Sequence, residues 1–281
     1  HILALCIDPM GNIIVQKLAE RGDLLRRLDI FAILAPFAAA LSCHKHGTWV
    51  MQKFIALAAQ SLHVMPEMIP ESLPVAIAAA LRPALVEILH DQYGNYVAQG
   101  CLALGPAGRF LLEAFIWRTD DIAKSRYGAR AMKSILEASL GDSCGGHDGH
   151  LTMKRFDCRY RERILDKLVE RVPFLANSAN ALVVYLWLAE QVPGYADKLV
   201  SQLAASKQPW SYVQGRHSLP FLTKLGDIAS VPALASFAAT FGEGAQSMKK
   251  SGKNAKILDP AAMKTLKAMC ERIQADFPQE A

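Results

Sequence analysis

Apolar residues recur along the chain with helical spacing, and four segments repeat one pattern around a glycine. The segments are DPMGNIIVQKLAE from Asp8, HKHGTWVMQKFIA from His44, DQYGNYVAQGCLA from Asp91 and SRYGARAMKSILE from Ser125. The fourth residue of each is a glycine, at Gly11, Gly47, Gly94 and Gly128, and apolar residues follow seven and eight positions later. This pattern predicts four amphipathic helices, each beginning at a corner of the chain.

The four glycines are separated by 36, 47 and 34 residues. An interval of about 35 residues is typical of stacked helical hairpins, and the longer interval indicates an insertion. We place the insertion in the proline-rich stretch His63–Pro74. No stretch shows the period-two alternation of a strand. The predicted fold is therefore all-α, a curved α-solenoid of stacked helical repeats.

We expect one repeat domain over residues 1–281. Its repeats cover about residues 1–28, 29–62, 75–110, 111–140 and 155–192, and degenerate helices follow over residues 195–281. A fifth, weaker copy of the pattern is SANALVVYLWLAE, which we align with Asn180 in the place of the glycine. Two glycine-rich stretches, Gly141–His150 and Gly242–Lys256, are predicted to be loops, the second one flexible.

Polar and aromatic side chains in the third copy need a separate explanation. Asn95, Tyr96 and Gln99 follow Gly94. On a helix, residues four apart share one face, so the two amides and the ring lie together. A core helix would not favour the amides, and a solvated helix would not need the ring. Such a face can offer hydrogen bonds beside a flat platform, and we expect the side chains of Asn95 and Gln99 to face outward.

Composition narrows the class of protein. Apolar residues make up 52% of the 281 residues and charged residues 20%, which indicates a folded chain. The net charge of +5 is compatible with an acidic partner but is weak evidence for one. Six irregularly spaced cysteines suggest a reducing compartment. The chain begins at His1 without a signal-peptide pattern, so we expect a fragment. The apolar run Ile30–Cys43 is too short to span a membrane, and Pro36 interrupts it.

No motif indicates an enzyme, and we expect no cofactor. His44 and His46 flank a turn without a nucleophile pattern around them. Metal-capable side chains occur in and after the first glycine-rich stretch, at Cys144, His147, His150 and Cys158, but their spacing matches no common zinc module. We therefore expect no metal. The basic run Lys154–Arg163 is either a solvated helix face or a set of phosphate contacts.

The segments GNIIVQK, GTWVMQK, GNYVAQ and GARAMK closely resemble the RNA-reading helices of the Pumilio (PUF) family. Four copies at near-family spacing make the resemblance specific. It covers Ile2 to roughly Ser139 and fades beyond that point. The chain is most similar to a divergent fungal branch with about six repeats, whose members often carry an upstream RNA-recognition motif.

The resemblance implies that single-stranded RNA is read one base per repeat. In the family, the first and fifth residues after the glycine contact the Watson–Crick edge of a base, and the second residue stacks between bases. We call these the +1, +5 and +2 positions. Amides at i and i+4 present the donors and acceptors that a base edge requires. Stacking contributes ~1–3 kcal/mol per base.

The three positions can be assigned in each copy. They are Asn12, Ile13 and Gln16 in the first copy, Thr48, Trp49 and Gln52 in the second, Asn95, Tyr96 and Gln99 in the third, and Ala129, Arg130 and Lys133 in the fourth. By resemblance, the first and third copies match the uracil pattern and the second tolerates adenine. In the fourth copy Arg130 can stack, whereas Lys133 carries donors only and contacts either a phosphate or a base.

The fifth copy would hold Ala181, Leu182 and Tyr185 at these positions, and no base-edge code survives there. We expect that helix to be structural or to contact a protein. In the family the RNA strand runs antiparallel to the protein, so the first three copies read U, A and U from the 5′ end. The insertion suggests one extra base between Trp49 and Tyr96, which gives a UAAU-like site.

The predicted function is sequence-specific binding of short U/A-rich elements in mRNA 3′ untranslated regions, for post-transcriptional regulation in the cytoplasm. A homodimer and a protein partner on the convex face are additional hypotheses, and no membrane span is expected. Two other functions stay open. One is a helical-repeat scaffold for proteins, and the other is a Pumilio-like ribosome-assembly factor that binds RNA without a sequence code.

Overall fold

The computed structural model describes residues 1–64, 72–141, 158–207, 209–250 and 260–276. These residues form helices and turns, and no strand is present among them. The predicted all-α class of stacked helical repeats is confirmed. The chain divides into two compact units, His1–Ile164 and Leu165–Ala281, which we describe separately. The single domain with its repeat boundaries stays a prediction.

The first unit contains four corner helices and the elements before and between them. The corner helices are α2 (Gly11–Arg21), α5 (Gly47–Val64), α8 (Gly94–Gly100) and α11 (Arg126–Gly141). The other elements are α1 (Ile2–Ile7), α3 (Leu24–Leu34), η1 (Ala35–Phe37), α4 (Ala38–Ser42), α6 (Leu73–Leu81), η2 (Arg82–Ala84), α7 (Leu85–His90), η3 (Cys101–Arg109), α9 (Phe110–Trp117) and α10 (Thr119–Lys124). The start of α12 (Cys158–Leu175) also belongs to this unit.

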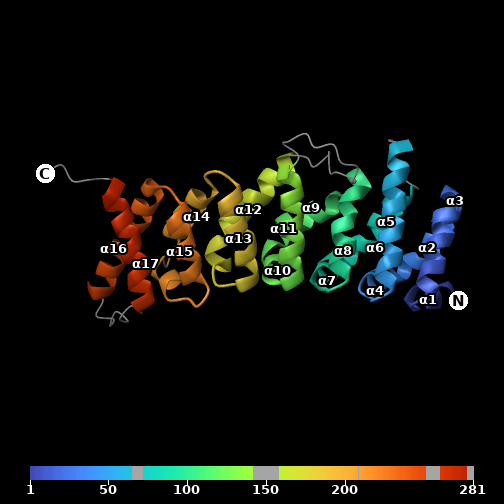
Figure 1. Ribbon diagram of the computed structural model, residues 1–281, viewed down its shortest axis with the longest axis horizontal. Coiled ribbons are helices and arrows are strands. Elements are labelled where there is room, and N and C mark those ends of the chain that lie inside the picture. Colours follow the sequence, from blue (N-terminus) through green and yellow to red (C-terminus); the bar gives the residue numbers. More distant parts are fainter. Residues whose placement is uncertain (65–71, 142–157, 208, 251–259, 277–281) are drawn as a thin grey trace. The chain divides into compact units, whose positions relative to one another are not determined.

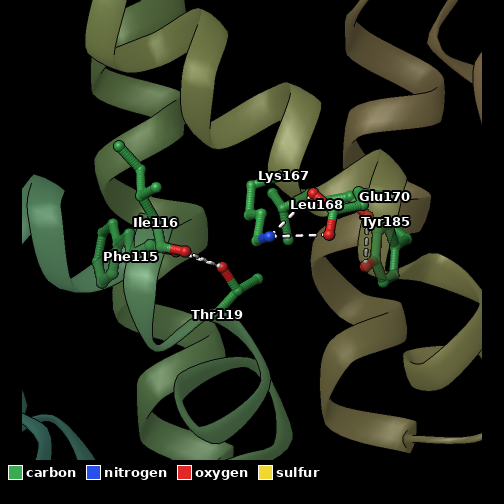
Figure 2. Close-up of polar contacts among 7 residues, drawn as sticks. All are labelled: Phe115, Ile116, Thr119, Lys167, Leu168, Glu170 and Tyr185. Carbon is green, nitrogen blue, oxygen red and sulfur yellow. Dashed lines mark hydrogen bonds and ion pairs between the residues drawn. The ribbon is translucent and has the colours of Figure 1, made fainter.

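The corner helices of the first unit lie side by side in chain order, α2 on α5, α5 on α8 and α8 on α11 (Figure 1). Aromatic rings fill the space between layers, as where Phe31 and Phe54 meet with centroids 5.6 Å apart. The bend between α9 and α10 is held by Thr119, whose hydroxyl donates to the Phe115 carbonyl at 2.6 Å (Figure 2). Each predicted corner is therefore built into a continuous apolar core.

The second unit repeats the same arrangement with different residues. After α12 it contains α13 (Ala179–Gln191), α14 (Tyr195–Ala204), η4 (Pro209–Val213), α15 (Ser218–Ile228), α16 (Val231–Lys250) and α17 (Pro260–Asp276). Helix α15 packs between α13 and α17, and α14 packs on α16. Three tyrosine hydroxyls donate to backbone carbonyls of α12, as Tyr185 does to Leu168 at 2.8 Å (Figure 2).

The repeat glycines are required by close packing, not by an unusual backbone. We aligned Asn180 with them on the assumption of a left-handed turn, but positive φ is found only at Gly105 and Gly194 among the described residues. A Cβ on Gly11 would lie 2.7 Å from the carbonyl oxygen six residues earlier, and one on Gly94 would lie 2.6 Å from the equivalent oxygen. Only glycine lets the preceding helix approach this closely.

Helix α2 differs from the other corner helices in the exposure of two aliphatic side chains, three and seven positions after its glycine. Ile14 is 53% exposed and Leu18 is 52% exposed. Their counterparts in the next three copies, such as Val50 and Phe54 of α5, are 4% exposed or less because they pack against neighbouring elements. The first copy therefore presents an aliphatic edge.

The second glycine-rich stretch is partly helical, which corrects our prediction of a loop. Helix α16 continues through Gly242 and ends at Lys250. The residues around the two glycines of this segment are mostly good helix formers, and they outweigh a cost of about 1 kcal/mol per glycine. Residues 251–256, residues 142–150 of the first predicted loop, and with them the cysteine and histidines at 144–150, lie outside the described residues.

One stretch, Leu73–His90, is long and apolar enough to cross a membrane by length and composition alone. In the structure it is not one straight helix, because the turn η2 at Pro83 separates α6 from α7. Leu73 and Leu89 are fully buried within the repeat array. The buried residues of the stretch, which make up 39% of it, belong to the core of the first unit.

Candidate nucleic-acid interface

In each of the four copies, the side chain three residues before the glycine accepts hydrogen bonds from backbone N–H groups of the corner. The Asp8 carboxylate accepts from the N–H of Met10 at 2.9 Å and of Gly11 at 2.6 Å. Asp91 does the same in the third copy, with both distances 2.7 Å. These bonds from Gly11 and Met10 lower the pKa of Asp8. The sequence carried this signal, a polar residue three positions before each glycine, which we had not interpreted.

The second and fourth copies use other acceptors at this position. His44 accepts through Nδ1 from the N–H groups of His46 and Gly47, at 3.2 and 3.3 Å. Ser125 accepts from Gly128 at 3.3 Å. His44 is thus an acceptor at its corner.

The +1 side chains are buried, which for Asn95 corrects our expectation that the side chain faces outward. Asn12 and Asn95 are each 4% exposed and Thr48 is 3% exposed. The Asn95 amide donates to the carbonyls of Asp91 at 3.0 Å and Gln92 at 2.9 Å. These carbonyls belong to the corner itself, so the asparagine ties the corner to its helix. Its oxygen points to the +5 position.

The +5 glutamine is held in place by the +1 residue in all three copies. Gln16 donates to the Asn12 oxygen at 2.9 Å, and Gln99 donates to the Asn95 oxygen at 3.0 Å. Gln52 donates to the Thr48 hydroxyl at 3.0 Å. Each glutamine uses one amide hydrogen in this bond, so its carbonyl oxygen and second hydrogen can meet a ligand. Positions +1 and +5 therefore lie on one helix face, as their spacing predicts, and their role in binding stays a prediction.

The +2 side chains are the exposed members of each triplet. Ile13 is 48% exposed, Trp49 is 56% exposed and Tyr96 is 60% exposed. Large aromatic side chains are seldom so exposed without a role, since burying them is favourable. The structure therefore does not use Trp49 and Tyr96 as core residues. Stacking on bases stays a prediction for them.

The fourth copy differs at each position. Ala129 is buried and offers no hydrogen-bonding side chain, whereas Arg130 is exposed. Lys133 lies 3.3 Å from a carboxylate oxygen of Glu137, one turn further along α11. The +5 position of this copy thus carries an ion pair in place of an amide.

The insertion between the second and third copies does not separate their corners. It follows the C-terminal end of α5, and the corner lies at the opposite end of that helix. The Thr48 hydroxyl donates to the Tyr93 carbonyl of the next corner at 3.3 Å. The structure therefore removes the reason we gave for an extra base between Trp49 and Tyr96. The extra base itself stays a prediction.

The fifth copy is shifted by one residue from our alignment. Ser178 accepts from the Ala181 N–H at 3.4 Å, so Ala181 takes the place of the glycine. Positions +1, +2 and +5 are then Leu182, Val183 and Leu186. Tyr185, which we had placed at +5, is fully buried and bonded to α12. Helical periodicity permits either Tyr185 or Leu186 at the +5 position. The sequence pattern therefore could not distinguish the two alignments.

Sequence reasoning missed a sixth corner in the second unit. Helix α15 begins at Ser218, which is fully buried and donates to the Tyr212 carbonyl at 2.7 Å. That carbonyl is six residues earlier, the same distance in sequence as the carbonyl facing each repeat glycine. At this corner a serine takes the place of the glycine, and its hydroxyl bonds the carbonyl oxygen six residues earlier. The recurring glycine could not reveal this corner, because a serine stands in its place.

Comparison with known proteins agrees with this geometry. The model of the Pumilio-family RNA binding repeat matches residues 1–35, 38–60 and 85–107. Pumilio domain-containing protein C56F2.08c of Schizosaccharomyces pombe is 29% identical over 190 residues, covering 67% of this chain and 25% of that protein. The mRNA-binding protein PUF2 of Saccharomyces cerevisiae is 28% identical over 184 residues, covering 65% of this chain and 15% of that protein.

A solved structure with a similar fold is the PUM-HD domain of S. pombe Puf1 in complex with RNA, with a TM-score of 0.68 and 20% identity. The match covers 99% of this chain and 70% of that chain. The chain spans a quarter or less of the two curated relatives described above.

The fold and the triplets define a class, a helical-repeat protein that displays one set of +1, +2 and +5 side chains per corner helix. The first three copies match the Pumilio-family RNA binding repeat, and the fold of the chain is similar to that of a Pumilio domain.

Proposed function

We propose that the first unit binds single-stranded RNA and reads U, A and U, from the 5′ end, with the third, second and first copies. The +1 and +5 residues contact the base edges, and Ile13, Trp49 and Tyr96 separate the bases by stacking. The strand direction follows from the family resemblance. A UAAU-like element is the longer form of this proposed site.

One observation carries the proposal. In three neighbouring helices a buried polar +1 residue fixes a glutamine at +5, beside an exposed +2 side chain. A packed core does not need such an arrangement, and a solvated face would not restrain the glutamine. A glutamine side chain that is already held in place loses little conformational entropy on binding, which favours recognition of a base edge.

The named relatives support the same function. PUF2 is described as an mRNA-binding protein, and the Puf1 structure contains RNA. A mutant Puf4 structure of similar fold, with a TM-score of 0.64, is bound to a 3′ UTR recognition sequence. We propose by extension that this chain acts on mRNA 3′ untranslated regions in the cytoplasm.

The second unit favours a different partner. Val183, at the +2 position of α13, is 46% exposed, and Leu186 replaces the +5 glutamine. Aliphatic side chains cannot pair with a base edge, so we infer that this face contacts a protein. A scaffold role for the second unit is compatible with RNA binding by the first.

The proposal is tested by titrating UAU-containing and UAAU-containing RNA, with each base changed in turn, at several salt concentrations. We expect each U-to-C change to weaken binding about tenfold, since a mismatched edge leaves polar groups unpaired at ~1–3 kcal/mol. Salt-sensitive binding without base preference would instead indicate a code-free RNA binder. No binding at any salt would favour the scaffold.

A further inference from the structure

The fourth corner helix holds a charged pair where the other three hold an amide. Lys133 at +5 and Glu137 at +9 lie 3.3 Å apart, and their side chains are 32% and 45% exposed. Ala129 at +1 is 2% exposed and cannot compete for hydrogen bonds. Helix α11 packs directly on α8, so this pair continues the series of +5 side chains from the third copy.

The Glu137 carboxylate changes which ligand groups can bind beside Lys133. A lysine that serves as a phosphate contact contributes a net positive charge, and here that charge has a partner on its own helix. Ion pairs that are partly open to solvent contribute little to stability, so a ligand can reorganise the pair at little cost. The site therefore offers donors from the ammonium group and two acceptors from the carboxylate, within one helical turn.

Among the four bases, guanine fits this set most fully. Its Watson–Crick edge has one acceptor, O6, followed by two adjacent donors, N1–H and N2–H. The ammonium group can donate to O6 while the two carboxylate oxygens accept the two donors. Uracil has one donor between two acceptors, so one of its carbonyls would face the carboxylate. Bonds to ionised groups are also stronger than those between neutral groups.

We propose that the fourth copy reads guanine, with Lys133 and Glu137 as its edge contacts and Arg130 as the stacking side chain. This inference rests on the proposed function and extends the site by one base. Because the RNA runs antiparallel, the guanine is 5′ to the U read by the third copy. The assignment replaces the phosphate contact that we considered for Lys133 from the sequence.

The test measures RNAs that carry G, A, C or U immediately 5′ to the UAU element. The wild-type protein is expected to bind the G form about tenfold more tightly than the others. Glu137→Gln should abolish that preference, because an amide supplies only one acceptor. Glu20→Gln is the matched control, since Glu20 occupies +9 in the first copy and pairs with Lys17. It should leave the G preference unchanged.

A second variant separates failure of this inference from failure of the proposed function. Ala129→Asn combined with Lys133→Gln gives the fourth copy the amides of the third, and it should prefer uracil at the same RNA position. If this variant prefers uracil but the wild type shows no preference for guanine, the inference is wrong and the base code stands. Wild-type binding that is equal for all four bases overturns the inference in every case. Loss of discrimination at the UAU bases as well would overturn the proposed function.

Discussion

Asn95 and Gln99 are neighbours on α8 but have different structural roles. Asn95 is buried and donates to two carbonyls of its corner, whereas Gln99 is half-buried and donates to Asn95 alone. We predict that Asn95→Ala lowers the free energy of unfolding by about 1–2 kcal/mol, because buried hydrogen bonds are lost. Gln99→Ala should change it by less than about 0.5 kcal/mol.

Urea unfolding of both variants measures the difference in stability. Titration with RNA then measures their effect on binding. Gln99→Ala should weaken binding at the U of the third copy although the fold is intact. An equal loss of stability in the two variants would show that the glutamine is also a structural group.

Asp8 makes the first corner sensitive to acid. Its pKa is lowered from the ordinary value because the folded carboxylate accepts from Gly11 and Met10. A lowered pKa means that the contribution to stability is present above the unfolded pKa and is lost as the pH falls through the folded pKa. The stability gap between wild type and Asp8→Ala should therefore stay constant from pH 6 to 8 and shrink below about pH 4. A gap that is as wide at pH 3 as at pH 7 would contradict the role of the carboxylate.

At this scale the sequence predicts which residues form the triplets but not how they point. The pairing of Asn12 with Gln16 follows from helical spacing alone. The burial of Asn12 does not follow from the spacing. It depends on hydrogen bonds to backbone carbonyls that only the folded corner brings close to the side chain. The misplacement of Tyr185 has the same origin, since an apolar helix face allows two registers and packing on α12 selects one.

Corner helices and the helices before them meet at backbone contact distance. A Cβ on Gly94 would lie 2.6 Å from the Ile88 carbonyl oxygen, whereas one on Gly100 of the same helix would lie 3.5 Å from Ile55. We predict that Gly94→Ala destabilises the protein by about 1–3 kcal/mol through overpacking. Gly100→Ala should be neutral or stabilising by up to about 1 kcal/mol, because alanine restricts the unfolded chain. Thermal unfolding of the two variants checks this, and similar melting temperatures would argue against the close approach.

Helix α15 shows the same corner with a different residue. Ser218→Ala removes the bond to the Tyr212 carbonyl and leaves that buried oxygen unsatisfied, so we expect a loss of about 1–3 kcal/mol. The exposed Ser201 of α14 provides a control, since Ser201→Ala should change stability by no more than about 0.5 kcal/mol. Equal effects in urea unfolding would mean that the Ser218 hydroxyl does not hold the corner.

The four glycine corners could be predicted because the glycine recurs with fixed apolar neighbours. The physical reason for the glycine could not, since it lies in the distance to a carbonyl six residues earlier. Without that reason the fifth and sixth corners, which use Ala181 and Ser218, were misaligned or missed.

For the whole molecule, the sequence resemblance and the structure cover different lengths. The Pumilio-family model matches the first three copies, over residues 1–35, 38–60 and 85–107, whereas the fold similarity covers 99% of the chain. The second unit keeps the helical arrangement after its triplets have changed, as the apolar Leu182 and Val183 show. A fold that depends on buried aliphatic positions tolerates such change, whereas a base code does not. We therefore assign RNA reading to the first unit.

The central claim is that each corner helix of the first unit selects its own base. The most direct measurement is a change of specificity in the second copy by Thr48→Asn, which gives it the same +1 and +5 amides as its two neighbours. Asn12 and Asn95 occupy the equivalent buried position, so the asparagine fits the corner. The variant and the wild type are titrated with RNAs that carry A or U at the middle base of UAU. The wild type should prefer A, and the variant should prefer U by about tenfold with both flanking preferences unchanged. A uniform change in affinity for both RNAs would contradict the base-by-base account.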